Sequence, residues 1–152
     1  MNREKNEYLG LPNGKVLQGL CSDLDIKGNG VVRVDNQIFI IPGLLPGEEG
    51  IFSISHKSKS IWYGKLRKIT SYSQNRVEPI CNVFNECGGC SLLHLSYSSQ
   101  QSHKLIQVKE TLRRIGLIDI TPRIVSSSKV TSTGYRNRTI IPLKRNDDLS
   151  IS

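Results

Sequence analysis

Three of the four cysteines lie close together, in a spacing typical of a metal site. Cys81, Cys87 and Cys90 follow the pattern C-x5-C-x2-C, and Gly88 and Gly89 separate the last two. Two intervening residues fold the chain back, so the thiolates of Cys87 and Cys90 can reach one metal centre. Three thiolates on such a loop fit a 4Fe-4S cluster that needs a fourth ligand, whereas zinc also accepts thiolates in tetrahedral sites. The spacing alone leaves both iron and zinc open.

The remaining cysteine, Cys21, stands apart from the other three and is interpreted as a packed thiol. Residues 1–8 form a polar tail without the apolar core of a secretory signal, and no apolar run is long enough to span a membrane. A cytoplasmic location is therefore expected, in which thiols stay reduced and clustered cysteines more often bind metal. His94 follows Cys90 and could complete a metal site, but we interpret it as a structural residue beside the cysteine loop.

Charge is distributed unevenly along the 152 residues, which carry a formal net charge of +8. Residues 1–56 contain 5 basic and 7 acidic side chains, whereas residues 57–76 contain 6 basic side chains and no acid. Residues 104–145 contain 10 basic and 2 acidic side chains. One-sided positive charge favours a polyanion such as RNA or DNA as partner, with a solvated basic surface as the alternative. A composition of 37% hydrophobic and 22% charged residues argues against wholesale disorder.

The segment 9–72 is predicted to be mainly β, in the form of a small five-stranded barrel of the OB type. Its apolar runs are short, and they are separated by the glycine, asparagine and proline residues that tight turns require. Closure of such a sheet into a barrel hides its edges. The predicted strands span residues 15–24, 31–34, 37–41, 50–56 and 60–69.

The last of these strands interleaves aromatic and basic residues, namely Trp62, Tyr63, Lys65, Arg67 and Lys68. Such a strand can stack bases while it holds phosphates. Alternatively, Trp62 fills the barrel and the lysines face water. We expect Lys65, Arg67 and Lys68 to contact RNA.

A helix is predicted after the cysteine loop. Four apolar residues recur at intervals of 3, 4 and 3, which places them on one helical face: Leu105, Val108, Leu112 and Ile115. Ser96 or Ser98 can cap its start, and Gly116 is expected to end it in the left-handed conformation. Glu110 and Arg114 are spaced for an ion pair within the helix.

The segment 73–152 is predicted to hold the cysteine loop, this helix and the start of an α+β domain that is cut short. Strands are expected over Pro122–Ser126 and Tyr135–Leu143. One helix and two strands cannot bury much apolar surface.

Three motifs together resemble the RNA uracil-5-methyltransferases, which form 5-methyluridine in rRNA or tRNA. Cys81–Tyr97 (CNVFNECGGCSLLHLSY) is similar to the cluster-binding motif of that family. Upstream, Asp25–Glu48 (DIKGNGVVRVDNQIFIIPGLLPGE) is similar to a TRAM domain, the small RNA-binding barrel that precedes the cluster in many of these enzymes. Downstream, Gly134–Arg138 (GYRNR) resembles the stretch that opens the central domain. The motifs stand in the family's order and cover nearly the whole chain.

The resemblance implies that Cys81, Cys87 and Cys90 are three ligands of a 4Fe-4S cluster. The family's fourth ligand is a cysteine further downstream, and no cysteine follows Cys90 here. The resemblance also implies S-adenosylmethionine (SAM) as methyl donor, bound by a doubly wound domain after the central one. Because no Gly-rich strand–turn–helix is found, neither a SAM site nor catalytic residues are expected in this chain.

We therefore predict the RNA-binding, Fe–S-binding N-terminal part of a SAM-dependent RNA uracil-5-methyltransferase, without its catalytic domain. Arg136 and Arg138 are expected to contact RNA together with the barrel. One alternative is a stand-alone RNA-binding module, and another is a small zinc-stabilised interaction protein; neither would be an enzyme by itself. The particular RNA, the particular uridine and the oligomeric state are left open.

Overall fold

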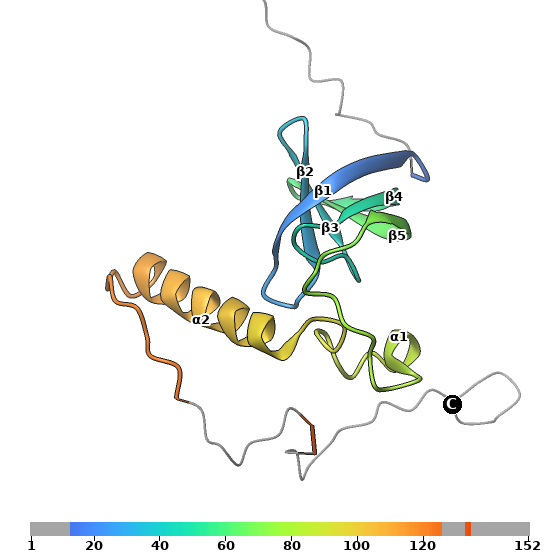
Figure 1. The fold of residues 1–152 in the computed structure, drawn as a ribbon. Coiled ribbons are helices and arrows are strands. Elements are labelled where there is room, and N and C mark those ends of the chain that lie inside the picture. The colour runs from blue at the N-terminus through green and yellow to red at the C-terminus, as the bar shows by residue number, and fades with distance from the viewer. Residues whose placement is uncertain (1–12, 126–132, 135–152) are drawn as a thin grey trace, which may run out of the picture.

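Five strands curve into a closed barrel in the computed structural model, which describes residues 13–125 and 133–134 (Figure 1). They are β1 Val16–Leu24, β2 Gly30–Val34, β3 Gln37–Ile41, β4 Glu49–Ser58 and β5 Ile61–Ser71. Their order around the barrel is β1-β2-β3-β5-β4, and all neighbours are antiparallel except β3 and β5. The predicted mainly-β, five-stranded OB-like barrel is confirmed, and each strand begins and ends within two residues of its predicted bounds.

Two turns show why the sequence folds in this way. Asp35 and Asn36, with φ of 46° and 61°, join β2 to β3 in a two-residue hairpin, and both residue types tolerate the left-handed region. Gly28, with φ of 85°, lies in the loop between β1 and β2. A Cβ atom at Gly28 would lie 2.9 Å from Cδ2 of Leu92, so this loop packs closely against the cysteine segment, the part of the chain that holds Cys81, Cys87 and Cys90 and continues to Leu95.

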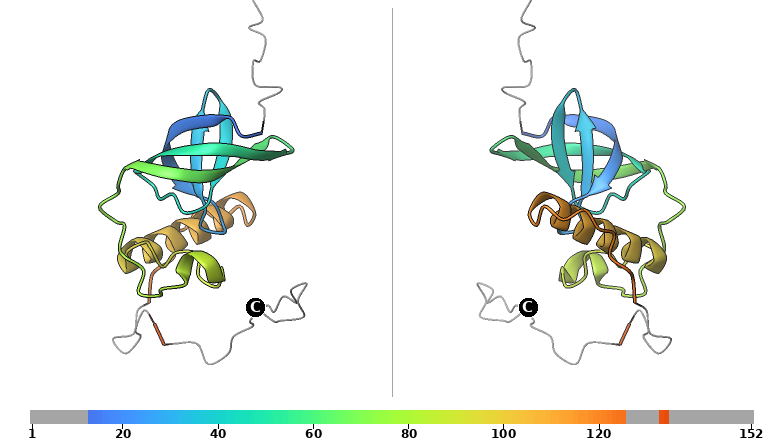
Figure 2. Two further views of the ribbon diagram at one scale, coloured as in Figure 1. Left: turned by 90° about the vertical axis from the view of Figure 1, so that its right-hand side faces the viewer. Right: turned by 90° about the vertical axis from the view of Figure 1, so that its left-hand side faces the viewer.

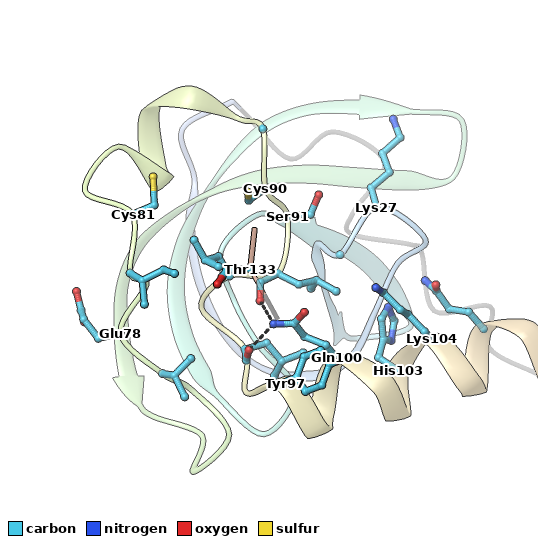
Figure 3. Close-up of a pocket in the computed structure, with 18 of the residues that line it drawn as sticks. Lys27, Glu78, Cys81, Cys90, Ser91, Tyr97, Gln100, His103, Lys104 and Thr133 are labelled. Atoms are coloured by element: carbon cyan, nitrogen blue, oxygen red, sulfur yellow. Dashed lines mark hydrogen bonds between the residues drawn. The ribbon is translucent and has the colours of Figure 1, made fainter. Parts of the chain in front are cut away.

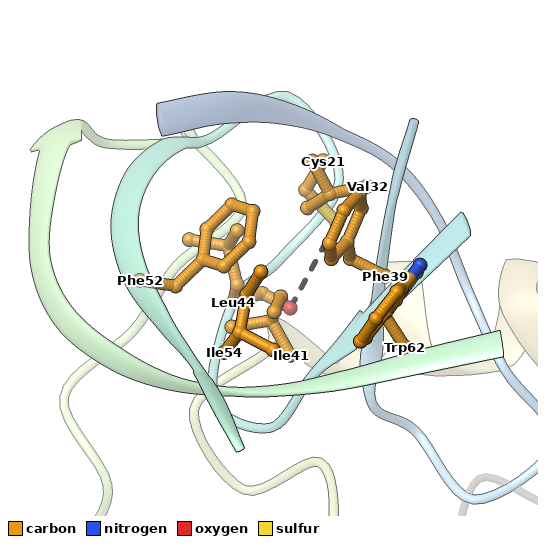
Figure 4. Packing of buried hydrophobic residues seen from close by; sticks show 8 residues of the cluster. All are labelled: Cys21, Val32, Phe39, Ile41, Leu44, Phe52, Ile54 and Trp62. Carbon is orange, nitrogen blue, oxygen red and sulfur yellow. Dashed lines mark hydrogen bonds between the residues drawn. The ribbon is translucent and has the colours of Figure 1, made fainter. Parts of the chain in front are cut away.

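The barrel interior is filled by eight buried residues (Figure 4), namely Cys21, Val32, Phe39, Ile41, Leu44, Phe52, Ile54 and Trp62. The ring of Phe39 packs against those of Phe52 and Trp62, with centroids 5.4 Å and 6.4 Å apart. Trp62 is 4% exposed, and its Nε1 donates a hydrogen bond to Oε1 of Gln37 at 3.2 Å. Of the two roles considered for Trp62, the structure therefore shows that it fills the barrel.

Cys21 is a packed thiol, as predicted. Its side chain is 1% exposed, and its Sγ donates to the carbonyl oxygen of Asp23 at 3.2 Å. Burial raises the pKa of Cys21 to about 11, so the thiol stays protonated at neutral pH.

A buried ion pair joins the barrel to the segment that follows β5. Glu48, at the end of the loop between β3 and β4, is fully buried and accepts hydrogen bonds from Nε and Nη2 of Arg76 at 2.6 and 2.8 Å. The backbone N–H groups of Leu45 and Ser73 also donate to its carboxylate, at 2.8 and 3.3 Å. Burial alone would raise the pKa of Glu48, but these bonds outweigh it and hold the pKa below its usual value.

A second, smaller apolar core lies beside this ion pair. Leu24 and Leu45 of the barrel pack with Leu95, and Leu92 covers them. The backbones of Arg76 and Leu95 form an isolated antiparallel bridge. These contacts hold the cysteine segment beneath the barrel (Figure 2).

Two helices follow, α1 Phe84–Cys87 and α2 Tyr97–Arg114. The predicted start of α2 at Ser96 is correct in position, although no side chain caps it. Glu110 forms the predicted ion pair with Arg114 at 2.9 Å and a second with Arg113 at 2.8 Å.

The prediction for Gly116 is wrong, because the left-handed residue after α2 is Leu117, with φ of 52°. The N–H of Gly116 still donates to the carbonyl of Thr111, at 3.4 Å. A Cβ atom at Gly116 would lie 2.9 Å from the carbonyl oxygen of Leu112. The glycine is therefore suited to this position by its small size.

The apolar face of α2 is less covered than its periodicity suggested, since no residue of α2 is buried. Val108 is 49% exposed and Ile115 is 81% exposed. Residues 122–125 form no strand, contrary to the prediction for Pro122–Ser126, since none of the described residues pairs with them in a ladder. Ser126 and the predicted strand Tyr135–Leu143 lie outside the described residues.

Among the residues that the structure describes, no helix is long and apolar enough to cross a membrane.

Candidate metal site and nucleic-acid interface

The backbone of the cysteine loop folds back on itself through α1. The carbonyl of Cys81 accepts a hydrogen bond from the N–H of Phe84 at 3.1 Å, which starts the short helix. Gly88 ends this helix with φ of 67°, a conformation that glycine adopts without strain. The chain therefore turns sharply between Cys87, the last residue of α1, and Cys90. The side chain of Cys87 lies outside the described part of the structure.

Cys81 and Cys90 are exposed free thiols that border one cleft of about 880 Å³ (Figure 3). The cleft is bounded by the barrel loop at Lys27, by the cysteine loop and by α2. Its α2 wall is held in place by Gln100, whose Nε2 donates to the carbonyl oxygens of Leu92 and Leu95 at 3.0 and 2.8 Å.

Cys81 and Cys90 are the thiol donors that the described side chains of this cleft offer to a metal centre. Two exposed thiols on one loop suit a soft metal or an Fe–S cluster, and neither thiol is committed to a disulfide. Among the side chains that the structure describes, no group of three or more His, Cys, Asp or Glu is arranged to hold a metal ion. The described part of the site thus offers two of the three predicted ligands.

His94 lies in the interior beside this loop rather than on its surface. It is 3% exposed, its ring packs against Phe84 with centroids 5.2 Å apart, and neither ring nitrogen has a hydrogen-bond partner within the described part of the chain. Burial, with a further contribution from the charge of Arg76, lowers the pKa of His94 to about 4. The imidazole is therefore neutral at physiological pH, and its burial against Phe84 agrees with its interpretation as a structural residue.

The predicted RNA-binding residues of β5 are exposed on the outside of the barrel. Lys65 pairs in register with Ser53, and Lys68 pairs with Ile51, while a β-bulge leaves Arg67 without a partner residue on β4. Because of this bulge, the consecutive residues Arg67 and Lys68 are both exposed. Leu66 before them and Ile69 after them pack against the core. Nε of Arg67 donates to Oγ of Ser53 at 2.9 Å, which holds the guanidinium along the barrel wall.

Arg136 and Arg138, the other two predicted RNA contacts, lie outside the described residues.

Sequence reasoning missed a pair of stacked rings on the same barrel. His56 on β4 lies directly opposite Tyr63 on β5, with ring centroids 4.7 Å apart and planes within 4° of parallel. Lys57 also went unnoticed, and its Nζ lies 4.7 Å from the centroid of the Trp62 ring. The sequence signal for the ring pair was that the last two strands follow each other closely and can pair. The bulge at Ser55 shifts their register by one residue, so the opposing residues could not be assigned from the sequence.

The fold and these residues define a small closed β-barrel with a basic outer wall, joined to a cysteine loop and a long helix. No known protein-family profile matches the chain. It is 39% identical over 134 residues to an uncharacterized RNA methyltransferase of Listeria monocytogenes, a match that covers 88% of this chain and 29% of the relative. It is 37% identical over 126 residues to another from Parasynechococcus marenigrum, which covers 83% and 27%.

A third relative is the 23S rRNA (uracil(1939)-C(5))-methyltransferase of Vibrio campbellii, 36% identical over 120 residues. This match covers 79% of the chain and 27% of the relative. The chain therefore belongs to the RNA methyltransferase family that these proteins represent, and it spans less than a third of the length of these relatives.

Proposed function

We propose that this chain is the RNA-binding and Fe–S-binding part of a SAM-dependent RNA uracil-5-methyltransferase that modifies rRNA or tRNA in the cytoplasm. The observation that carries the proposal is an exposed basic barrel wall joined to a cysteine loop, in a chain related over most of its length to RNA methyltransferases. One relative carries the uracil-C5 specificity in its name. Methyl transfer from SAM is proposed for the whole enzyme.

The barrel wall supports RNA binding by its charge and by its shape. Lys65, Arg67 and Lys68 are exposed, and residues 57–76 contain no acidic side chain that could neutralise them. Cations of this kind bind phosphates and release counterions, so affinity falls steeply with salt. A rigid sheet holds the three side chains on one wall, which orders the phosphates they contact.

The cysteine loop supports the metal proposal through its ligands and its turn. Cys81, Cys87 and Cys90 would hold the cluster, which when bound would cross-link the loop and contribute structure to the protein. The chain's own residues prepare this arrangement, because Phe84 starts α1 and Gly88 reverses the backbone between two of the thiols. The cleft beside the loop gives the site room for a group larger than one ion.

RNA binding is tested with the triple variant Lys65→Ala, Arg67→Ala and Lys68→Ala. Affinity for a uridine-containing rRNA hairpin and for bulk tRNA is measured by fluorescence anisotropy between low and high salt. Loss of three phosphate contacts is expected to reduce the slope of log affinity against log salt by about 2. The matched control removes three cations from α2: Lys104, Lys109 and Arg113. Equal slopes for the triple variant and the native chain would contradict the assignment of the barrel wall.

The metal proposal is tested by iron, zinc and acid-labile sulfide analysis of anaerobically purified protein. About four irons and four sulfides per chain are expected, with loss of both in Cys81→Ala and in Cys90→Ala. Cys21→Ala is the control, since this cysteine is buried in the barrel, and it should retain the cluster. Zinc without sulfide would instead favour the zinc-stabilised interaction protein.

A further inference from the structure

We propose that His56 and Tyr63 form a platform on which one unpaired RNA base stacks, beside the phosphate-binding cations of the same barrel wall. This inference rests on the proposed RNA binding. It adds a stacking contact to a base, beside the contacts of the cations to the phosphate backbone. The occupant is a nucleobase of single-stranded RNA, because the two parallel rings present a flat π surface and the surrounding charge is positive.

Strand register places the two rings on the outside of the barrel. Phe39, Ile41 and Trp62 belong to the core, so the alternation of side chains puts their neighbours Ile40 and Tyr63 on the outer face. Ile40 pairs with Tyr63 across β3 and β5, and Tyr63 pairs with His56 across β5 and β4. The three residues thus form one row across three strands, with His56 at its end.

The far side of the His56 ring is left open by the end of the neighbouring strand. In the described part of the chain, β1 pairs with β4 only as far as Ser53, and the residues before β1 reach Ile54 through backbone hydrogen bonds at 2.8 and 2.9 Å. On the side of β4 that faces away from β5, no described strand therefore reaches His56, which is exposed. The exposed face of the His56 ring is where a base would continue the stack.

The other aromatic residue of β5 is not available for this task. Trp62 is 4% exposed, packs against Phe39, and has Lys57 over its ring. A base-stacking role for this strand can thus be carried only by Tyr63 and its partner His56.

Cations flank the platform at a distance suited to the backbone of a stacked nucleotide. Lys65 lies two residues beyond Tyr63 on the same outer face, about 7 Å along the strand. Lys59 lies at the other end, in the turn from β4 to β5. Positive charge on both sides of two parallel rings is the combination found where proteins bind single strands by stacking.

The test compares two probes of equal length and charge, a single-stranded oligouridylate and an abasic ribose-phosphate oligomer. Both are measured at one fixed salt concentration against the full chain. The native chain is expected to prefer the oligouridylate by about tenfold. His56→Ala should bring the two affinities close together, whereas His56→Phe, which keeps a ring, should retain the preference. Because His56 is exposed, these variants are expected to fold, and the emission of buried Trp62 checks this.

Tyr72→Ala is the matched control, because Tyr72 is a 68% exposed tyrosine just beyond β5 that lies outside the stacked pair. If His56→Ala keeps the base preference of the native chain, the platform is wrong while RNA binding by the lysines stands. If the Tyr72 variant alone loses the preference, the base stacks elsewhere and the inference is likewise overturned. If the native chain binds neither probe, the proposed function itself fails.

Discussion

The Glu48–Arg76 ion pair allows a specific prediction about stability. In Glu48→Gln the side chain keeps its size, but one of the two oxygens becomes an NH2 group. Each oxygen of Glu48 accepts one bond from Arg76 and one from a backbone N–H. In either orientation, the NH2 group of the glutamine would therefore face two N–H donors that need an acceptor. The substitution therefore leaves buried N–H groups unpaired and removes the countercharge of Arg76.

The magnitude follows from the burial of the two partners. Removal of one partner from a buried ion pair costs about 3–5 kcal/mol. Arg76 is 22% exposed and keeps a bond from Nη2 to the carbonyl of Gly43 at 2.7 Å, which moves the expectation to the lower end of that range. We expect Glu48→Gln to lower the free energy of unfolding by about 3 kcal/mol. In urea this corresponds to a midpoint lower by about 1–3 M.

The assay is urea unfolding followed by the fluorescence of Trp62, the only tryptophan of the chain and a member of the barrel core. Glu49→Gln is the control, because it makes the same chemical change one residue away. Glu49 is half-buried and its side chain has a weak contact of 3.5 Å with Thr70, so a change below about 0.5 kcal/mol is expected. Equal midpoints for the two variants would refute the central role of the ion pair.

The two partners should also act as a unit. Arg76→Gln leaves the buried Glu48 carboxylate without its countercharge, so this variant alone should lose about as much stability as Glu48→Gln. In the double variant the unpaired charge disappears, and its loss should be smaller than the sum of the two single losses. Strict additivity in this cycle would show that the two side chains do not interact.

Three further predictions concern single residues in the barrel core, beside the cysteine loop and in that loop. Gly64→Ala places a Cβ atom 2.6 Å from an isoleucine methyl, so thermal unfolding should show a loss of about 1–3 kcal/mol. The pKa of His94 is about 4 in the folded chain, against 6.5 for a free histidine. As pH falls from 6.5 to 4, the unfolded chain therefore binds a proton that the folded chain does not, and the free energy of unfolding decreases. Urea unfolding should show a slope of up to about 1.4 kcal/mol per pH unit there, which His94→Leu should flatten. In native apo-protein, iodoacetamide at pH 8 should label Cys81 and Cys90 and spare Cys21, as mass spectrometry can show.

Much of the barrel could be predicted from sequence because its signals are local. Short β-branched runs end at residues that favour tight turns, and the Asp35–Asn36 hairpin takes the left-handed angles that such residues tolerate. The packed thiol of Cys21 and the Glu110–Arg114 pair follow from equally local patterns. The two possible roles of Trp62, in contrast, depended on which face of β5 is inside.

The stacked rings of His56 and Tyr63 could not be predicted, because their contact depends on register across two strands. The bulge at Ser55 moves His56 opposite Tyr63, and nothing near His56 in the sequence marks that bulge. The predicted helix is present as α2, but the cover of its apolar stripe could not be predicted, for a different reason. Periodicity predicts which face of a helix is apolar but not what covers it, and Val108 is 49% exposed among the described residues.

The two candidate sites belong to one mechanical unit, because several contacts join the barrel to the cysteine segment. Glu48 anchors Arg76 from one side, Leu95 completes a core with two barrel leucines, and Gln107 of α2 donates from Nε2 to the carbonyl of Asp25 at 3.3 Å. The cysteine loop lies between these attachment points in the sequence. Its position relative to the barrel is therefore set by buried contacts rather than by a flexible linker. An RNA held on the barrel wall would then have a defined direction relative to the cysteine cleft.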